Sequence, residues 1–74
     1  MIHNTLVKTK NVDFFLTFES FPTIKRAAEE SKITVQHALR LLKVWISQGY
    51  VVKTDRYVLT AAGLSVKHKL EVLL

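Results

Sequence analysis

The stretch from Thr34 to Gly49 constrains this chain most, because it has the pattern of an amphipathic helix with both ends marked. Its apolar residues recur at intervals of three and four, the period of a helix with one buried face. These residues are Ala38, Leu41, Leu42, Trp45 and Ile46. Thr34 can cap the N-terminus with its hydroxyl, and Gly49 suits the left-handed residue that ends a helix. We therefore predict a helix over residues 34–48 with its apolar face in a core.

The other face of this predicted helix is basic and carries one amide. It presents Val35, Gln36, Leu39, Arg40 and Lys43. Such a face can be the solvated side of a core helix. It can also lie in a DNA major groove, where amide and guanidinium groups bond to base edges. The helix alone leaves both interpretations open, and the flanking sequence bears on the choice.

Length and charge indicate one small domain with an anionic partner. The chain has 74 residues, 49% of them hydrophobic, and no cysteine, so we expect one domain without disulfides. Eleven Lys and Arg against six Asp and Glu give a net charge of +5. Seven of these cations and three of these acids lie in residues 25–56, where most of the excess is found. A basic surface of this kind most often meets nucleic acid.

Several classes of function lack their usual sequence signals. No apolar run approaches the roughly 18 residues of a membrane span, and the N-terminus lacks the layout of a signal peptide, so we expect a cytoplasmic protein. His3, His37 and His68 have no metal-ligand spacing. With two glycines, no paired carboxylates and no nucleophile triad, the sequence predicts no enzyme, metal, cofactor or small-molecule substrate.

The sequence before this helix indicates two more helices. Residues 1–10 are expected to form an arm or a strand, and Asn11 is expected to cap a first helix over residues 11–20. That helix is too apolar for one buried side, so it is either sandwiched or in a subunit interface. Pro22 breaks it, and residues 20–22 are a candidate minimal strand. Thr23 then caps a second helix, Ile24 to Ser31.

After Gly49 the pattern changes from helical to extended. Residues 50–53 and 57–59 read as two strands of a hairpin with a polar tip at 54–56. Thr60 is a candidate cap for a last helix, Ala61 to about Leu74, which ends on three apolar residues. The predicted order is helix, short strand, helix, turn, helix, hairpin, helix.

In this order the sequence resembles a winged helix-turn-helix domain of small prokaryotic, archaeal or viral and plasmid transcription regulators, MarR-like or ArsR-like. The resemblance is carried by TIKRAAEESKITVQHALRLLKVWISQGYVVKTDRYVLTAAG, residues 23–63. It implies an α+β, mainly α fold in one domain, 1–74. The helix-turn-helix would occupy 23–49, the wing 50–59 and the C-terminal helix 60–74.

The resemblance also implies which residues touch DNA. Val35, Gln36, Leu39, Arg40 and Lys43 would face the bases, with Gln36 suited to adenine and Arg40 to guanine. The implied backbone contacts are Lys25, Arg26, Lys32, Thr34, His37, Lys53, Thr54 and Arg56.

The sequence departs from the pattern of this family at three places. Lys32 stands at the turn position where glycine is common, which predicts strain or a modified turn. Leu39 is apolar on the expected reading face, so it either touches a thymine methyl group or is buried by a rotation of the helix. The wing is short, which weakens any role in reading bases.

The leading hypothesis is a sequence-specific regulator that binds double-stranded DNA, with a two-fold dimer on a palindromic site. The predicted dimer residues are Phe14, Phe18, Val66, Leu70, Leu73 and Leu74. A compact monomer could instead bury them in its own core. The alternative functions are a winged-helix module for protein interaction and a non-specific architectural DNA-binding protein.

Overall fold

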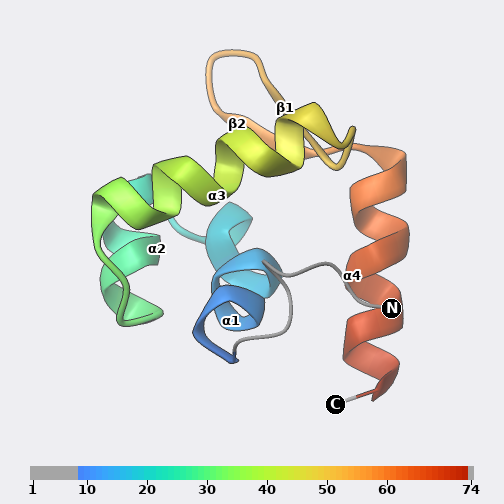
Figure 1. The fold of residues 1–74 in the computed structure, drawn as a ribbon, viewed down its shortest axis with the longest axis horizontal. Coiled ribbons are helices and arrows are strands. Elements are labelled where there is room, and N and C mark those ends of the chain that lie inside the picture. The colour runs from blue at the N-terminus through green and yellow to red at the C-terminus, as the bar shows by residue number, and fades with distance from the viewer. Residues whose placement is uncertain (1–8, 74) are drawn as a thin grey trace.

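A computed structural model describes residues 9–73 of the chain. In this range the fold is α+β and mainly α, as predicted, with four α-helices and one antiparallel hairpin (Figure 1). The elements are α1 (Thr9–Thr17), the 3-10 helix η2 (Phe18–Ser20), α2 (Ile24–Glu30), α3 (Val35–Ser47), β1 (Val51–Lys53), β2 (Tyr57–Leu59) and α4 (Ala61–Leu73). Most of the predicted N-terminal arm, and Leu74, lie outside the described residues.

Helix α3 begins and ends where the sequence indicates. The backbone N–H of His37 donates to the Thr34 hydroxyl at 3.0 Å, which satisfies one of the free donors of the first turn. Gly49 has a φ of 82°, the left-handed conformation that glycine adopts without a steric penalty. The predicted cap of α2 is also present, since Arg26 N–H donates to Thr23 Oγ1 at 3.1 Å.

The turn between α2 and α3 is closed by a strained lysine. Lys32 has a φ of 60°, and it is the one non-glycine residue with positive φ in the described chain. The neighbouring Ile33 N–H reaches back to the carbonyl of Ala28 at 3.0 Å. The prediction of strain at Lys32 is therefore confirmed, because a side chain in this conformation crowds its own carbonyl.

The start of the chain differs from the prediction. Helix α1 begins at Thr9, so Asn11 lies inside it and is not its cap. Asn11 is buried, and its Oδ1 lies 2.9 Å from His37 Nε2 on α3. Because α1 begins two residues before Asn11, the Asn11 side chain is not needed as a cap and links α1 to α3 instead.

The predicted minimal strand at residues 20–22 is also wrong. Ser20 ends η2, and the sheet of the described chain has only β1 and β2. The outer edge of β2 is instead met by Glu19, whose Oε2 accepts the Leu59 N–H at 2.9 Å. One carboxylate thus satisfies an edge donor that a third strand would otherwise pair.

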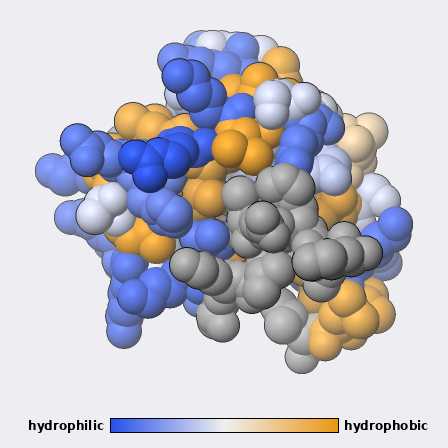
Figure 2. All heavy atoms as spheres, viewed as in Figure 1, coloured by the Kyte–Doolittle hydropathy of each residue, from blue (hydrophilic) through white to orange (hydrophobic). Residues whose placement is uncertain are grey.

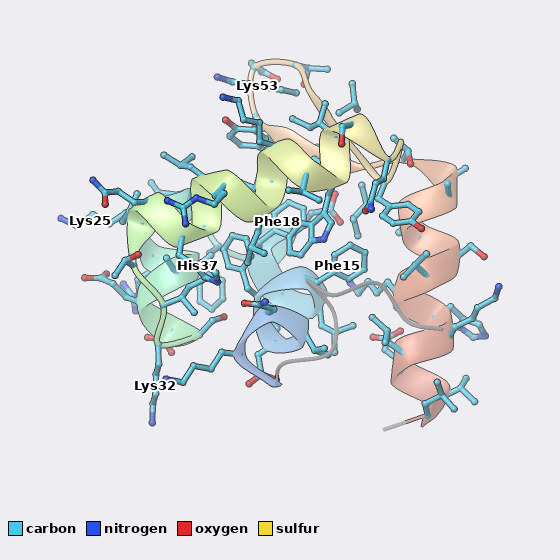
Figure 3. All side chains as sticks on the ribbon, viewed as in Figure 1. Phe15, Phe18, Lys25, Lys32, His37 and Lys53 are labelled. Atoms are coloured by element: carbon cyan, nitrogen blue, oxygen red, sulfur yellow. The ribbon has the colours of Figure 1, made fainter. Side chains whose placement is uncertain are left out.

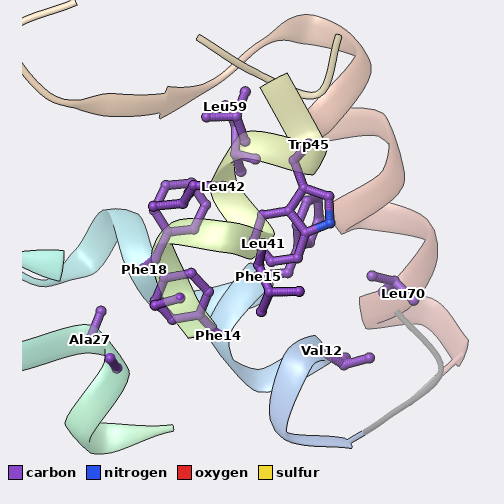
Figure 4. Packing of buried hydrophobic residues seen from close by; sticks show 13 residues of the cluster. Val12, Phe14, Phe15, Phe18, Ala27, Leu41, Leu42, Trp45, Leu59 and Leu70 are labelled. Carbon is purple, nitrogen blue, oxygen red and sulfur yellow. The ribbon is translucent and has the colours of Figure 1, made fainter. Parts of the chain in front are cut away.

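The core is built on the aromatic residues of α1 and η2 around Trp45 of α3 (Figure 4). The ring centroids of Phe14, Phe15 and Phe18 lie 5.9, 4.9 and 6.4 Å from that of Trp45. Phe14 and Phe18 are 0% and 1% exposed. The prediction that they form a dimer surface is therefore wrong, because α1 is sandwiched within its own chain.

Helix α4 packs on this core by one side only. Leu70 is buried and lies toward Val12 of α1 at one edge of the cluster (Figure 4), so it too is unavailable to a partner. Val66 is half-buried against the core. Among the predicted dimer residues that the structure describes, only Leu73 is exposed enough to contact a second copy. Leu64 and Val72 of α4, which were not predicted as dimer residues, are exposed as well.

The hairpin is joined to the start of α4 by close backbone contacts. Its register pairs Val51 with Leu59 and Lys53 with Tyr57. Thr60 N–H donates to the Tyr50 carbonyl at 2.9 Å, and the Thr60 hydroxyl caps α4 by accepting the Gly63 N–H. In residues 9–73 every helix is too short or too polar to traverse a bilayer.

Candidate nucleic-acid interface

The outer face of α3 is divided lengthwise into an apolar strip and a polar strip. The apolar strip consists of Val35, Leu39 and Ile46, which are 37%, 43% and 39% exposed. With 3.6 residues per turn these three lie within about 40° of one another around the helix axis. The polar strip consists of Gln36, Arg40 and Lys43, all exposed, centred about 90° further round.

The polar strip is exposed as predicted, and the apolar strip differs from the prediction at Ile46. Leu39 is exposed, so the alternative in which it is buried by helix rotation is wrong. Ile46, which was predicted to face the core, lies on the outer face instead. Its helical position is at the edge of the buried arc, where the core formed by Leu42 and Trp45 ends, and the periodicity does not resolve such an edge.

A groove of about 450 Å³ separates the apolar strip from the hairpin. Its lining consists of Leu39, Arg40, Lys43, Ile46 and Tyr57. Lys53 of β1 extends over the Tyr57 ring, with its Nζ 5.2 Å from the centroid, a cation–π distance. The lining thus combines apolar side chains with two cations and contains no carboxylate. Figure 2 shows hydrophilic and hydrophobic side chains mixed over this region.

Tyr57 is a residue that the sequence analysis missed. It was interpreted only as part of the returning strand, although it lines the groove beside α3 and pairs with Lys53 across the hairpin. The signal available in the sequence was an aromatic residue one position after the basic tip. It carries little weight by itself, because aromatic residues are common in strands.

The hairpin tip is fixed to the body of the protein. Arg56 Nη2 donates to the Glu19 carbonyl at 3.0 Å, so part of its guanidinium group is already bonded. Thr54 Oγ1 donates to Asp55 Oδ1 at 3.0 Å, and its backbone N–H donates to the Arg56 carbonyl. A smaller cavity of about 210 Å³ lies between this tip and residues 21–24.

The predicted backbone-contact cations do not all gather in one place. Figure 3 shows Lys25 beside the N-terminal half of α3 and Lys53 on the hairpin, whereas Lys32 points away from both, at the far side of the turn. Arg26 lies 3.7 Å from Glu30 in an exposed pair, which restrains it only weakly. Lys25 and Lys53 are therefore the predicted cations that flank the outer face of α3.

Thr34 and His37 already have internal partners. The Thr34 hydroxyl accepts the N–H of His37, and the His37 ring bonds to Asn11. Because a carboxamide oxygen can only accept, His37 Nε2 carries the proton of this bond. The structure uses His37 to hold α1 against α3, which fixes the direction of the α3 N-terminus.

The described residues contain no group of three or more His, Cys, Asp and Glu side chains that could hold a metal ion. Comparison of the chain with protein-family models, with curated proteins and with solved structures finds no match. The outer face of α3, the groove beside it and the cations around them are the features of the described residues that bear on function.

Proposed function

We propose that this chain is a winged helix-turn-helix domain that binds double-stranded DNA sequence-specifically and regulates transcription in the cytoplasm. In this proposal α2 and α3 form the helix-turn-helix, and the hairpin with Lys53, Thr54 and Arg56 at its tip is the wing. The order of the elements and the tight turn at Lys32 support this assignment.

The observation that carries the proposal is the character of the outer face of α3. Arg40 and Lys43 are exposed there, Gln36 supplies an amide, and no acidic residue occurs between Val35 and Ser47. A solvated helix surface usually mixes both signs of charge. A face with cations and an amide alone is suited to the phosphates and base edges of a duplex.

The dimensions of α3 are compatible with this role. Its 13 residues extend about 20 Å, and a helix of this length fits the major groove, which is about 12 Å wide. Lys25 lies beside the N-terminal half of α3, and Lys53 lies on the hairpin beside the same helix (Figure 3). With α3 in the groove, both can meet phosphates on either side of the bases read by Gln36 and Arg40.

We also propose that two copies act together through α4. Val72 and Leu73 are 72% and 73% exposed, although each is a large apolar side chain. The lower right of Figure 2 shows an apolar group at the C-terminal end of α4. A two-fold pair would place two recognition helices about 34 Å apart on a palindromic site.

The proposal is tested with a pool of random duplexes at low and moderate salt, followed by sequencing of the bound fraction. Wild type is compared with Arg40→Ala/Lys43→Ala and with the control Lys10→Ala/Lys67→Ala, which removes the same charge from α1 and α4. We expect salt-sensitive binding and an enriched motif for wild type and the control, and their loss in the α3 variant. Equal loss in both variants would show a general charge effect.

A protein-interaction module is the second candidate, and the exposed apolar strip of α3 is the observation that favours it. This candidate predicts no duplex binding even at low salt. A third outcome, salt-sensitive binding without an enriched motif, would indicate an architectural DNA-binding protein.

A further inference from the structure

The apolar strip of α3 lies on the face that would enter DNA, beside the side chains that would bond to it. Val35 and Leu39 are 37% and 43% exposed, although residues of their size are usually buried. They share the first half of α3 with Gln36 and Arg40, and residues in this half of a recognition helix contact bases.

The two strips match the two halves of an A·T base pair. In the major groove adenine presents an acceptor and a donor, N7 and N6, which a carboxamide such as that of Gln36 can bond to together. Thymine presents the O4 acceptor and a C5-methyl group, which needs an apolar neighbour. Gln36 and Leu39 lie on adjacent strips about 60° apart, so one pair can meet both.

We infer that α3 selects sites rich in A·T pairs, with Leu39 and Val35 against thymine methyl groups and Gln36 on adenine. This inference rests on the proposed function and names the substrate class of the same face. Arg40 adds one guanine contact beside these pairs.

The spacing along α3 sets where the thymines lie. Val35 and Leu39 are four residues apart, a rise of about 6 Å, which is a little under two base-pair steps of 3.4 Å. The inferred site therefore has two thymines about two steps apart. Ile46 lies roughly 10 Å beyond Leu39, in the C-terminal half of α3, so it is not one of the inferred base contacts.

Charge favours DNA over a protein as the occupant of this face. Arg40 and Lys43 line the groove with Leu39, and Lys53 stands over Tyr57 at its edge. A protein partner would have to supply acidic groups against these cations as well as an apolar surface. A DNA duplex has phosphates on both sides of its major groove and thymine methyl groups on the floor of that major groove, all in fixed positions.

The test uses a duplex selected by wild type and the same duplex with deoxyuridine in place of each thymidine. This change removes only the C5-methyl groups. Wild type is compared with Leu39→Ala and with the control Leu64→Ala, which shortens an exposed leucine on α4. Affinities are measured at one salt concentration, after circular dichroism has shown the same helix content for all three proteins.

For wild type we expect uridine to weaken binding about fourfold for each methyl group that is read, the effect of exposing one apolar carbon. Leu64→Ala should show the same ratio of affinities for the thymidine and deoxyuridine duplexes as wild type. For Leu39→Ala this ratio should be about fourfold smaller, because one methyl contact is already lost. Equal affinity of wild type for both duplexes, with its sequence preference kept, overturns the inference and leaves the proposed function standing. Failure of wild type to bind the unmodified duplex overturns the proposed function itself.

Discussion

At the scale of single residues, Glu19 and Gly63 determine how the hairpin is attached to the helices. The Glu19 carboxylate accepts the Leu59 N–H, and its main-chain carbonyl accepts from Arg56. Gly63 lets α4 approach the chain at Tyr50 so closely that an added Cβ would overlap the Tyr50 carbonyl oxygen. Neither role is visible in the residue type alone.

Replacing Glu19 tests the first attachment. Glu19→Ala leaves the Leu59 N–H without its acceptor in a partly buried place, so we expect a loss of about 1–2 kcal/mol in the free energy of unfolding. Glu19→Gln keeps an acceptor oxygen and should lose less. Urea unfolding followed by circular dichroism measures both. The exposed Glu29→Ala is the control, and an equal loss there would contradict the assigned role.

Replacing Gly63 tests the second attachment, the close approach of α4 to Tyr50. In an ordinary helix Gly→Ala stabilises, because it restricts the unfolded chain. Here the new Cβ would overlap Tyr50 O and lie 3.0 Å from Leu59 Cδ2, so Gly63→Ala should destabilise the protein by about 3 kcal/mol or more. Gly49→Ala meets no atom within 4 Å and carries only the strain of its positive φ, about 1–2 kcal/mol. Thermal unfolding should rank the two variants in this order.

At the scale of elements, the direction of α3 is set by contacts at its two ends. The turn at Lys32 and the bond between His37 and Asn11 fix its N-terminus against α2 and α1. At its C-terminus the Tyr50 N–H donates to the Trp45 carbonyl at 2.9 Å, which leads the chain directly into the hairpin. The outer face of α3 is thereby presented beside Tyr57 and Lys53.

The turn provides a stabilising substitution. Lys32→Gly removes the left-handed strain and adds freedom to the unfolded chain, so we expect a net gain of about 0.5–1 kcal/mol in the free energy of unfolding. Lys32→Ala removes the same charge and keeps the strain, so it should change stability by less than about 0.5 kcal/mol. Chemical denaturation compares them, and equal effects would mean that charge, not φ, matters at this position.

At the scale of the whole molecule, the proposed association with DNA and with a second copy depends on the charge distribution and on the exposed part of α4. The net charge of +5 is concentrated in residues 25–56, and the large apolar side chains exposed on α4 include Val72 and Leu73. The molecule therefore offers one surface suited to an anionic ligand and a separate surface suited to a second copy.

Salt dependence tests the first surface. Each phosphate contact contributes about −0.9 to the slope of log affinity against log salt concentration. Because Lys53 is assigned one phosphate, Lys53→Ala should make the slope less steep by about 0.9. Lys67→Ala, on α4 away from Val72 and Leu73, should leave the slope unchanged. An unchanged slope for Lys53→Ala would remove the hairpin from the DNA contacts.

Sedimentation velocity tests the second surface. We expect Val72→Ser/Leu73→Ser to shift the protein from dimer to monomer without a change in helix content, because both side chains are exposed in the single chain. Val52→Ser, at an apolar residue on the hairpin that is 43% exposed, is the control and should remain dimeric. A monomeric wild type at micromolar concentration would overturn the proposed pairing through α4.

The sequence predicted the elements better than it predicted their partners. The helices at residues 24–30 and 35–47 and the hairpin at 51–59 were expected nearly to the residue, because their caps and periodicities are local. The expectations for Asn11, Phe14 and Phe18 failed, because each depends on a contact with residues more than 20 positions away. The sequence predicted that the outer face of α3 carries Val35, Gln36, Leu39, Arg40 and Lys43, but it did not predict Ile46 on that face or Tyr57 of β2 beside it.

The sequence alone determined where α2, α3 and the hairpin lie, since hydrogen bonds within a helix and the hydroxyl caps of Thr23 and Thr34 involve neighbours in the chain. The tertiary structure decided which apolar residues form the core and which remain outside, because burial depends on how α1, α3 and α4 pack around Trp45. It also decided that Glu19, in place of a strand, meets the edge of β2, and that Tyr57, with Lys53 over its ring, lines a groove beside α3. Periodicity assigns a residue to a face of its own helix, but only packing determines what that face meets.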